Sequence, residues 1–286
     1  MIKLCAVTDE AGVNIDDIIK AFRNMGVHVC EIREVNGKGV LELSESEAQE
    51  IYNKLKEKQI EVWSIASPIG RNDLAIDFAA FGERVKKAIT LAKIFNAPHI
   101  RVFSFLEHNN NEAEVIKRLQ YVVTEAGKEN IKVCLENHHG CFADTPDKMI
   151  ALLDKIPGLL SVYDAGNYVA ANANTDDALT KALPRAHYVH VKDGAHINGA
   201  YQTTPPGEGE ANFASILKGV GSKDMPFSIE HRLATPKEGE TFEQVQGAHK
   251  FAYPNKMAAF FDAVGHLRML LLKAGYMEIH EGLFKK

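Results

Sequence analysis

Four ionisable residues end four successive apolar runs between residues 132 and 232: Glu136, Asp164, His190 and Glu230. Charged side chains are costly to bury unless they are paired or bind an ion, and carboxylates gathered together raise one another's pKa values. A divalent cation removes that conflict. Three oxygen ligands and one imidazole suit Mn, Mg, Co or Zn, and the lack of thiolates argues against a structural zinc site. The pattern predicts one divalent metal site; the alternative is four separate salt bridges and helix caps.

The elements that would bring these residues together form a regular alternation. Short apolar runs alternate with amphipathic helical patterns, and the runs cover residues 3–9, 27–33, 60–67, 99–105, 132–138, 159–167, 187–193 and 226–232. Near-continuous apolar runs are typical of parallel strands buried on both faces. Eight such repeats favour a closed barrel over an open sheet, and the strand ends of a barrel converge on one face. We therefore predict an α/β fold, a single (β/α)8 TIM-barrel domain spanning residues 1–286.

Local signals place several helices and two long loops. Ser44 and Glu47 form a capping box, and Thr145 is an N-cap ahead of Pro146. Weaker helices are expected near 176–183 and 211–219, and a strong one near 256–274. The connections 194–210 and about 233–253 follow the last two strands. Long loops on this face are expected to be lids or substrate walls; the alternative is a disordered surface excursion.

Composition restricts the class of partner. The formal net charge of -5 makes nucleic acid a poor partner, because a mildly acidic surface repels phosphate backbones. No secretory signal is visible, and no segment approaches the roughly 18 apolar residues of a membrane span. The four cysteines form no CxxC pair and are expected to be reduced thiols in the core. These features predict a cytoplasmic protein with no nucleic-acid or membrane partner.

The motifs LENHHG, YDAGN, HVKDG with the following PPGEGE, and IEHR occur in this order. Together with SPIGR at 67–71 and RVFSF at 101–105, the set resembles the xylose isomerase-like barrel superfamily of sugar phosphate isomerases and epimerases. The resemblance implies a small carbohydrate substrate and a catalytic metal, usually Mn, on Glu136, Asp164, His190 and Glu230. It also implies that Glu136 and Glu230 are the acid/base pair that moves a proton through an enediolate. Such barrels commonly form dimers or tetramers, so a homo-oligomer is possible.

One departure from the family pattern concerns Asn167. Many members have D-x-x-H on the sixth strand, and Asn167 stands where that histidine would be. In the endonuclease IV branch the histidine binds zinc in a three-metal cluster. Because asparagine is a poor zinc ligand, the sequence disfavours the hypothesis of an endonuclease IV-like phosphodiesterase. By resemblance to the epimerases, Asn167 is expected to position substrate through neutral hydrogen bonds.

Other residues near the strand ends are candidates for binding substrate. His138, Lys192 and Arg232 share the inward parity of the metal-ligand candidates that they follow. The alternatives are that His138 supports a metal ligand and that Lys192 forms an internal ion pair. Glu208, in the PPGEGE turn, is a possible further acid.

Several residues earlier in the chain are also expected to lie inside the barrel. Glu31, Arg33 and Arg101 are candidates for interior ion pairs, and Arg33 could instead bind an anion. Phe103 could wall the sugar or pack in the core. His139 is expected to face the helix layer, and Asp193 to brace the following loop.

Several functions remain open. The favoured function is that of an isomerase or epimerase of a ketose, keto-acid or related polyol. A lyase or dehydratase of a keto-inositol or keto-sugar begins with the same proton abstraction, and the two differ only in the fate of the enediolate. That difference rests on the placement of a second acid to within about an ångström. A phosphodiesterase and a non-catalytic sugar-binding barrel are the remaining alternatives.

Overall fold

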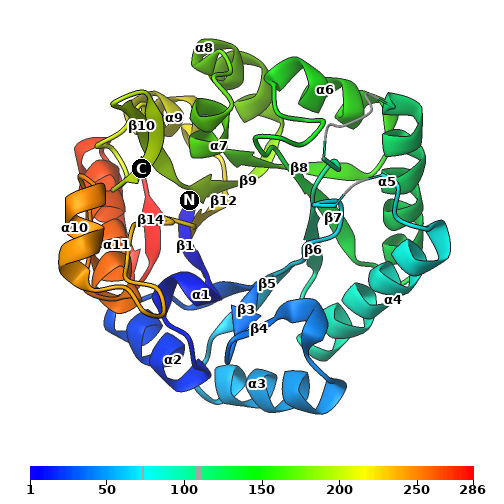
Figure 1. Cartoon of the computed structure of the whole chain (residues 1–286), viewed down its shortest axis with the longest axis horizontal. Coiled ribbons are helices and arrows are strands. Elements are labelled where there is room, and N and C mark those ends of the chain that lie inside the picture. The colour runs from blue at the N-terminus through cyan, green and yellow to red at the C-terminus, as the bar shows by residue number, and fades with distance from the viewer. Residues whose placement is uncertain (73, 107–110) are drawn as a thin grey trace.

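The computed structural model describes residues 1–72, 74–106 and 111–286. Parallel strands close into a barrel because the last of them, β12, pairs with β1 (Figure 1). The predicted (β/α)8 barrel is therefore confirmed. The barrel strands are β1 (Ile2–Val7), β2 (Val29–Ile32), β5 (Glu61–Ala66), β6 (His99–Val102), β7 (Lys132–Glu136), β8 (Leu159–Asp164), β9 (Ala186–Val191) and β12 (Met225–Ile229).

Helices form a ring around these strands, as Figure 1 shows. Their inward faces are apolar; in α2, for example, Ile15, Ile18 and Phe22 are buried, as expected for helices packed on a sheet. The longer helices are α2 (Ile15–Asn24), α3 (Glu45–Glu57), α4 (Phe78–Ile94), α5 (Glu112–Gly127), α6 (Pro146–Lys155), α9 (Phe213–Val220) and α11 (Lys256–Lys273). Shorter ones are α1 (Thr8–Ala11), α7 (Ala165–Ala170), α8 (Thr175–Asp177) and α10 (Phe242–Ala248).

Within the described residues, three antiparallel hairpins are added to the barrel. The first joins β3 (Glu34–Val35) to β4 (Lys38–Gly39), and the second joins β10 (Asp193–Ile197) to β11 (Ala200–Thr204). The third, β13 (Met277–His280) with β14 (Leu283–Lys285), pairs with β1 near its start. The long connection predicted at 194–210 is thus largely an ordered hairpin, and the one at 233–253 contains α10.

The capping prediction at Ser44 is confirmed, because the Ser44 hydroxyl accepts the Glu47 N–H at 3.2 Å and Glu47 accepts the Ser44 N–H at 2.8 Å. Helix α6 begins at Pro146 with Thr145 as N-cap, although the Thr145 side chain makes no cap hydrogen bond.

The weak helix predicted near 176–183 is confirmed as a helical segment, although its hydrogen-bond pattern changes along its length. The chain forms one α turn, a π turn at Ala178–Ala182 and a 3-10 turn at Leu183–Arg185. Pro184 lies in that last turn, and proline cannot donate the backbone hydrogen bond that would continue a helix.

Among the described residues, no helix is both long enough and apolar enough to cross a membrane.

Candidate metal centre

The four predicted ligands meet at the carboxyl ends of β7, β8, β9 and β12. Glu136 and Asp164 are the last residues of β7 and β8, and Glu230 directly follows β12. His190 lies opposite Asp164 in the register of β8 and β9. All four are buried. The barrel topology brings together residues that are up to 94 positions apart in the sequence.

One polar atom of each residue lacks a hydrogen bond within the described part of the chain: Glu136 Oε2, Asp164 Oδ2, His190 Nδ1 and Glu230 Oε2. His190 Nδ1 lies 2.9 Å from Glu230 Oε2, 3.5 Å from Glu136 Oε2 and 3.8 Å from Asp164 Oδ2. Buried polar atoms are nearly always hydrogen-bonded. Four exceptions gathered at one point therefore indicate that something else satisfies them.

A divalent metal fits these atoms. The four ligand atoms lie within 4.8 Å of one another. Ligand atoms that lie about 2.1 Å from a common ion lie roughly 3 to 4 Å apart. The oxygen-rich donor set matches the hard and borderline divalent ions predicted from the sequence.

His190 is oriented by Glu31, which lies across the barrel on β2. His190 Nε2 lies 2.9 Å from Glu31 Oε1, so the imidazole turns Nδ1 toward the carboxylates. Glu31 also accepts hydrogen bonds from Tyr188 at 2.7 Å and Ser228 at 2.5 Å. Carboxylates commonly fix metal-binding histidines in this way. The sequence predicted Glu31 as an interior ion-pair partner, and its contact with His190 confirms that.

Each glutamate of the cluster has an arginine beside it. Arg101 Nε lies 3.1 Å from Glu136 Oε2, and Arg33 Nη1 lies 2.8 Å from Glu230 Oε1. Burial alone would raise both pKa values, but Arg101 and His190 lower the pKa of Glu136 to about 2. Arg33 and His190 likewise hold the pKa of Glu230 well below its usual range. Both glutamates are therefore ionised at neutral pH.

The pKa values of the other two predicted ligands, Asp164 and His190, are raised. Burial, and then Glu136 and Glu230, raise the pKa of Asp164. Burial lowers the pKa of His190, but Glu31, Glu136 and Glu230 outweigh it and raise the pKa well above its usual value. The expected mutual rise among the carboxylates is thus correct for Asp164 and wrong for the two glutamates, because the arginines offset it.

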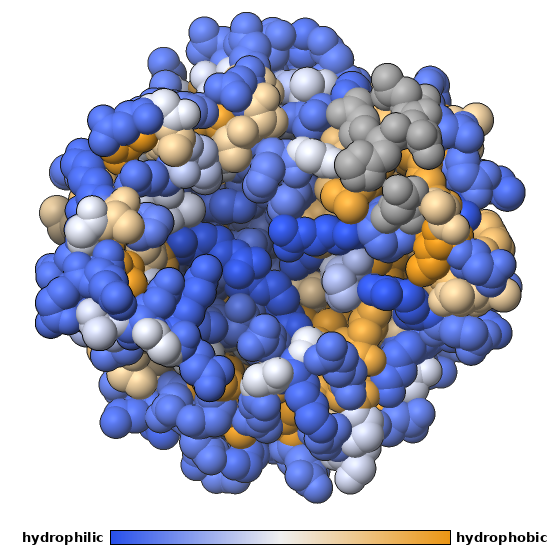
Figure 2. All heavy atoms as spheres, in the orientation of Figure 1, coloured by the Kyte–Doolittle hydropathy of each residue, from blue (hydrophilic) through white to orange (hydrophobic). Residues whose placement is uncertain are grey.

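A cavity of about 890 Å³ opens above this cluster. Figure 2 shows the face hollowed at its centre, where hydrophilic residues gather. The predicted substrate contacts His138, Lys192 and Arg232 all line it, together with Glu230 and Phe103. Burial lowers the pKa of His138 to about 4, which keeps that imidazole neutral.

Asn167 is brought to the cluster but does not line the cavity. Its amide donates to Glu136 Oε1 at 2.9 Å, and its oxygen accepts from Lys192 Nζ at 2.7 Å. With both ends of the amide engaged and the side chain fully buried, Asn167 orients Glu136 and Lys192. The expectation of a direct substrate contact is corrected accordingly.

Two other expectations also need correction. Glu208 is exposed and lines a separate surface pocket beside α11, so the fold does not bring it to the cluster. Arg33 is not free to bind an anion, because it pairs with Asp9, Glu10 and Glu230. Asp193 does brace its loop, accepting backbone N–H groups of Gly207, Gly209 and Ala211.

Sequence reasoning missed three residues. Asn137 donates to the Asp164 carbonyl and accepts its N–H, both at 2.8 Å, which ties β7 to β8 beside the ligands. Arg71 and His139 line the cavity, although His139 was expected to face the helices. The charge of Arg71, directly after Gly70 in the loop that follows β5, was the available signal.

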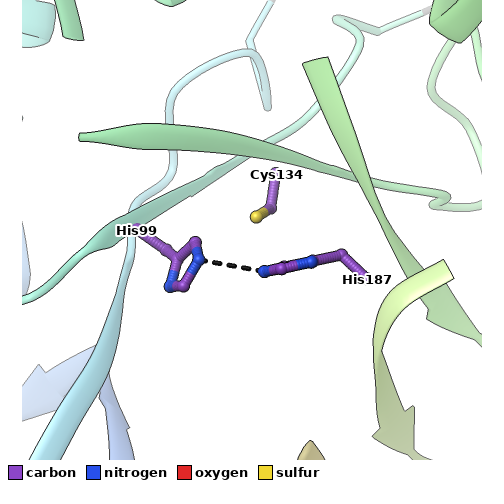
Figure 3. Close-up of side chains that lie close together, drawn as sticks. All are labelled: His99, Cys134 and His187. Carbon is purple, nitrogen blue, oxygen red and sulfur yellow. Dashed lines mark hydrogen bonds between the residues drawn. The ribbon is translucent and has the colours of Figure 1, made fainter. Parts of the chain in front are cut away.

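A second group that could hold a metal lies toward the amino ends of the strands: His99, Cys134 and His187 (Figure 3). His99 Nε2 lies 2.9 Å from His187 Nε2, and His99 Nδ1 lies 3.0 Å from the Trp63 carbonyl oxygen. Both nitrogens of His99 are therefore already hydrogen-bonded.

The fold and the cluster define the class: a TIM barrel with a group of residues at the carboxyl ends of its strands that could hold a metal ion. The chain belongs to the xylose isomerase-like TIM barrel family, whose model matches residues 19–249. A search of curated proteins found no match.

Solved structures share the fold at low identity. A probable 3-DHS dehydratase, AsbF from Bacillus anthracis, is 18% identical with a TM-score of 0.67, covering 93% of this chain and 98% of that one. An L-ribulose 3-epimerase is 15% identical with a TM-score of 0.69, covering 96% of each chain. The IOLI protein with a bound zinc atom is 16% identical with a TM-score of 0.71, covering 96% of this chain and all of that one, 100%. These neighbours include an epimerase and a dehydratase.

Proposed function

We propose that this chain is a metal-dependent isomerase or epimerase of a ketose, keto-acid or related polyol. One observation carries the proposal. Four buried, hydrogen-bond-deficient ligand atoms converge at the inner end of a cavity large enough for a sugar, and two of them belong to ionised glutamates. Pockets that combine convergent polar groups with shifted pKa values are typical of active sites.

Glu136, Asp164, His190 and Glu230 would hold one divalent ion, with Mn favoured by family resemblance. When bound, the ion would supply Lewis-acid stabilisation of the negative charge that develops on a carbonyl oxygen as the neighbouring carbon loses its proton.

Glu136 and Glu230 are the proposed proton carriers. Both start ionised: one removes the proton from the carbon beside the carbonyl and later releases it to solvent, while the other first takes up a proton from solvent and then delivers it to the opposite face of that carbon. Arg101 and Arg33 keep the two carboxylates charged, and Asn167 fixes the orientation of Glu136 through its 2.9 Å hydrogen bond. His138, Lys192 and Arg232 line the cavity, where they would hold the substrate hydroxyl and carbonyl oxygens.

A lyase or dehydratase of a keto-inositol or keto-sugar is the second candidate. Lys192 Nζ lies 3.7 Å from Asp164 Oδ2 in the cavity wall and could protonate a departing hydroxyl group. The dehydratase among the structural neighbours supports the same alternative.

The test is NMR of Mn²⁺-loaded protein with a panel of ketoses and keto-inositols in heavy water. Deuterium incorporation beside the carbonyl with a new isomer supports the isomerase, and loss of water supports the lyase. Glu136→Gln and Glu230→Gln are expected to abolish exchange, whereas Glu50→Gln on the exposed face of α3 is the matched control. Full exchange in either of the first two variants would falsify the paired-glutamate assignment.

A further inference from the structure

The loop after β5 carries the SPIGR motif, which the metal chemistry leaves unexplained. The loop is fastened to the end of β6. Ser67 Oγ donates to the Arg101 carbonyl at 2.7 Å, and Phe105 N donates to the Gly70 carbonyl at 2.6 Å. Gly70 has φ of +76°, and a Cβ on it would lie 2.0 Å from the Phe103 carbonyl oxygen, so only glycine fits. The backbone next to Arg71 is therefore held in one place.

Arg71 extends from this loop into the cavity. Its guanidinium carbon lies 5.7 Å from the centre of the Phe103 ring, and the same ring has Arg101 at 4.3 Å, so the two guanidinium carbons are at most about 10 Å apart. Arg101 contacts Glu136 of the candidate metal centre. Arg71 is therefore close enough for one small ligand to contact both Arg71 and the metal centre. Burial, then Arg232 and Arg101, lower its pKa, which reflects a cation facing other cations.

Arg71 makes no ion pair with any residue that the structure describes. Two further cations on α4, Arg84 and Lys87, line the same cavity and also lack an ionic partner among the described residues. By contrast, Arg33 and Arg101 deeper in the cavity are each paired with carboxylates.

The nearby acids do not neutralise these cations. Glu83 pairs with Lys86, which leaves Glu34 and Glu42 as the acids of this rim without an ionic partner in the described chain; Glu42 accepts the Gly39 N–H. Three cations without an ionic partner against two such carboxylates leave this rim with an excess of positive charge, in contrast with a chain whose net charge is -5. Unpaired cations around a concave site raise the local concentration of anions.

We infer that the substrate carries an anionic group, a carboxylate or a phosphate, which Arg71 binds with Arg84 and Lys87 while the other end of the molecule meets the metal centre. This inference rests on the proposed function for the identity of the reacting end. Arginine suits the task because its planar fork matches the oxygens of both groups.

The experiment is calorimetric binding to Mn²⁺-loaded protein of three probes with one carbon skeleton: fructose, fructuronate and fructose 6-phosphate. They end in a hydroxymethyl, a carboxylate and a phosphate group, so the preferred probe also identifies the anion. We expect at least one anionic probe to bind on the order of 10- to 100-fold more tightly than fructose, and Arg71→Gln to remove that advantage. Arg23→Gln, an exposed arginine on α2, is the control and should leave it intact.

The inference is overturned if neither anionic probe binds more tightly than fructose, or if the advantage survives in Arg71→Gln. Its failure is separable from failure of the proposed function. Proton exchange on neutral ketoses without any anion preference would leave the function standing and remove this inference. If binding shows a preference for an anionic probe that depends on Arg71 but no substrate exchanges a proton, this inference stands and the proposed function fails.

Discussion

The two ends of the barrel each gather side chains that could bind a metal, yet they differ in one respect. At the carboxyl end, each of the four ligand residues has a buried atom without a hydrogen bond in the described structure. At the amino end, His99 is hydrogen-bonded through both nitrogens, to His187 and to the Trp63 carbonyl. Both nitrogens of His99 are thus already occupied. Ligand types alone therefore do not distinguish the two groups, whereas the convergence of unsatisfied buried ligand atoms favours the carboxyl end as the metal site.

Electrostatics separates the two ends in the same way. Glu31, Glu136 and Glu230 outweigh burial and raise the pKa of His190 well above its usual value, so a proton sits among the carboxylates when no metal does. At the amino end burial lowers the pKa of His99 to about 4 and also lowers that of His187. One end attracts positive charge, and the other excludes it.

The largest expected effect is the loss of one carboxyl-end ligand. Asp164→Asn should weaken Mn²⁺ binding by more than about 100-fold, because even residues that only support a ligand are worth 10- to 100-fold. Titration calorimetry measures the change. Cys134→Ser at the amino end is the matched control and should bind Mn²⁺ normally. Equal losses in the two variants would erase the distinction between the ends.

The next largest effect concerns the support for His190. Glu31→Gln should weaken Mn²⁺ binding by about 10- to 100-fold, because the neutral amide no longer fixes the imidazole with Nδ1 toward the cluster. The same titration applies. Ser228→Ala removes one hydrogen bond to Glu31 but keeps its charge, so it should have the smaller effect. A larger loss in Ser228→Ala would show that packing, and not the carboxylate, positions His190.

Much of this arrangement was predictable from the sequence, and the limits have physical reasons. The barrel followed from the alternation of apolar runs and helices, and the ligands from their place at the run ends. The partnership of Glu31 with His190 spans 159 positions, so it depends on which strands face each other once the barrel closes. The register shift between β8 and β9 leaves His187 without a partner on β8, and alternation of residue types does not predict such a shift.

The residues around the cavity show the same limits. Parity correctly brought His138, Lys192 and Arg232 to the cavity. It could not show that Asn167 uses its whole amide on neighbouring side chains. Glu208 was predicted from motif context alone; in the structure it lies in the turn after β11 and lines a separate pocket beside α11.

A smaller effect is the pH dependence of metal binding. The raised pKa of His190 means that the metal must displace a proton from it, so Mn²⁺ affinity should rise with pH by about 10-fold per unit below that pKa. Calorimetry in buffers of different ionisation enthalpy counts the protons released. Release of no proton near pH 7 would contradict the shift assigned to His190.

The smallest effect lies at the amino end. With its pKa lowered to about 4, His99 stays neutral in the folded protein, while unfolded histidine titrates near 6.5. Its contribution to stability is therefore present above about pH 6.5 and is lost as the pH falls toward 4. Urea unfolding of the metal-free protein at pH 7 and pH 5 measures this. His99→Gln should reduce the difference in unfolding free energy between pH 7 and pH 5, because up to about one proton fewer binds on unfolding. An unchanged difference in unfolding free energy would rule out this role of His99.

The most direct test of the metal centre is pulsed electron paramagnetic resonance of the Mn²⁺-loaded protein, because the two ends offer different numbers of imidazoles. The account predicts one Mn²⁺ per chain with a single histidine nitrogen bound to it, and the loss of that nitrogen signal in His190→Gln. Coupling to two histidine nitrogens, or a nitrogen signal that persists in His190→Gln and disappears in His187→Asn, would contradict it.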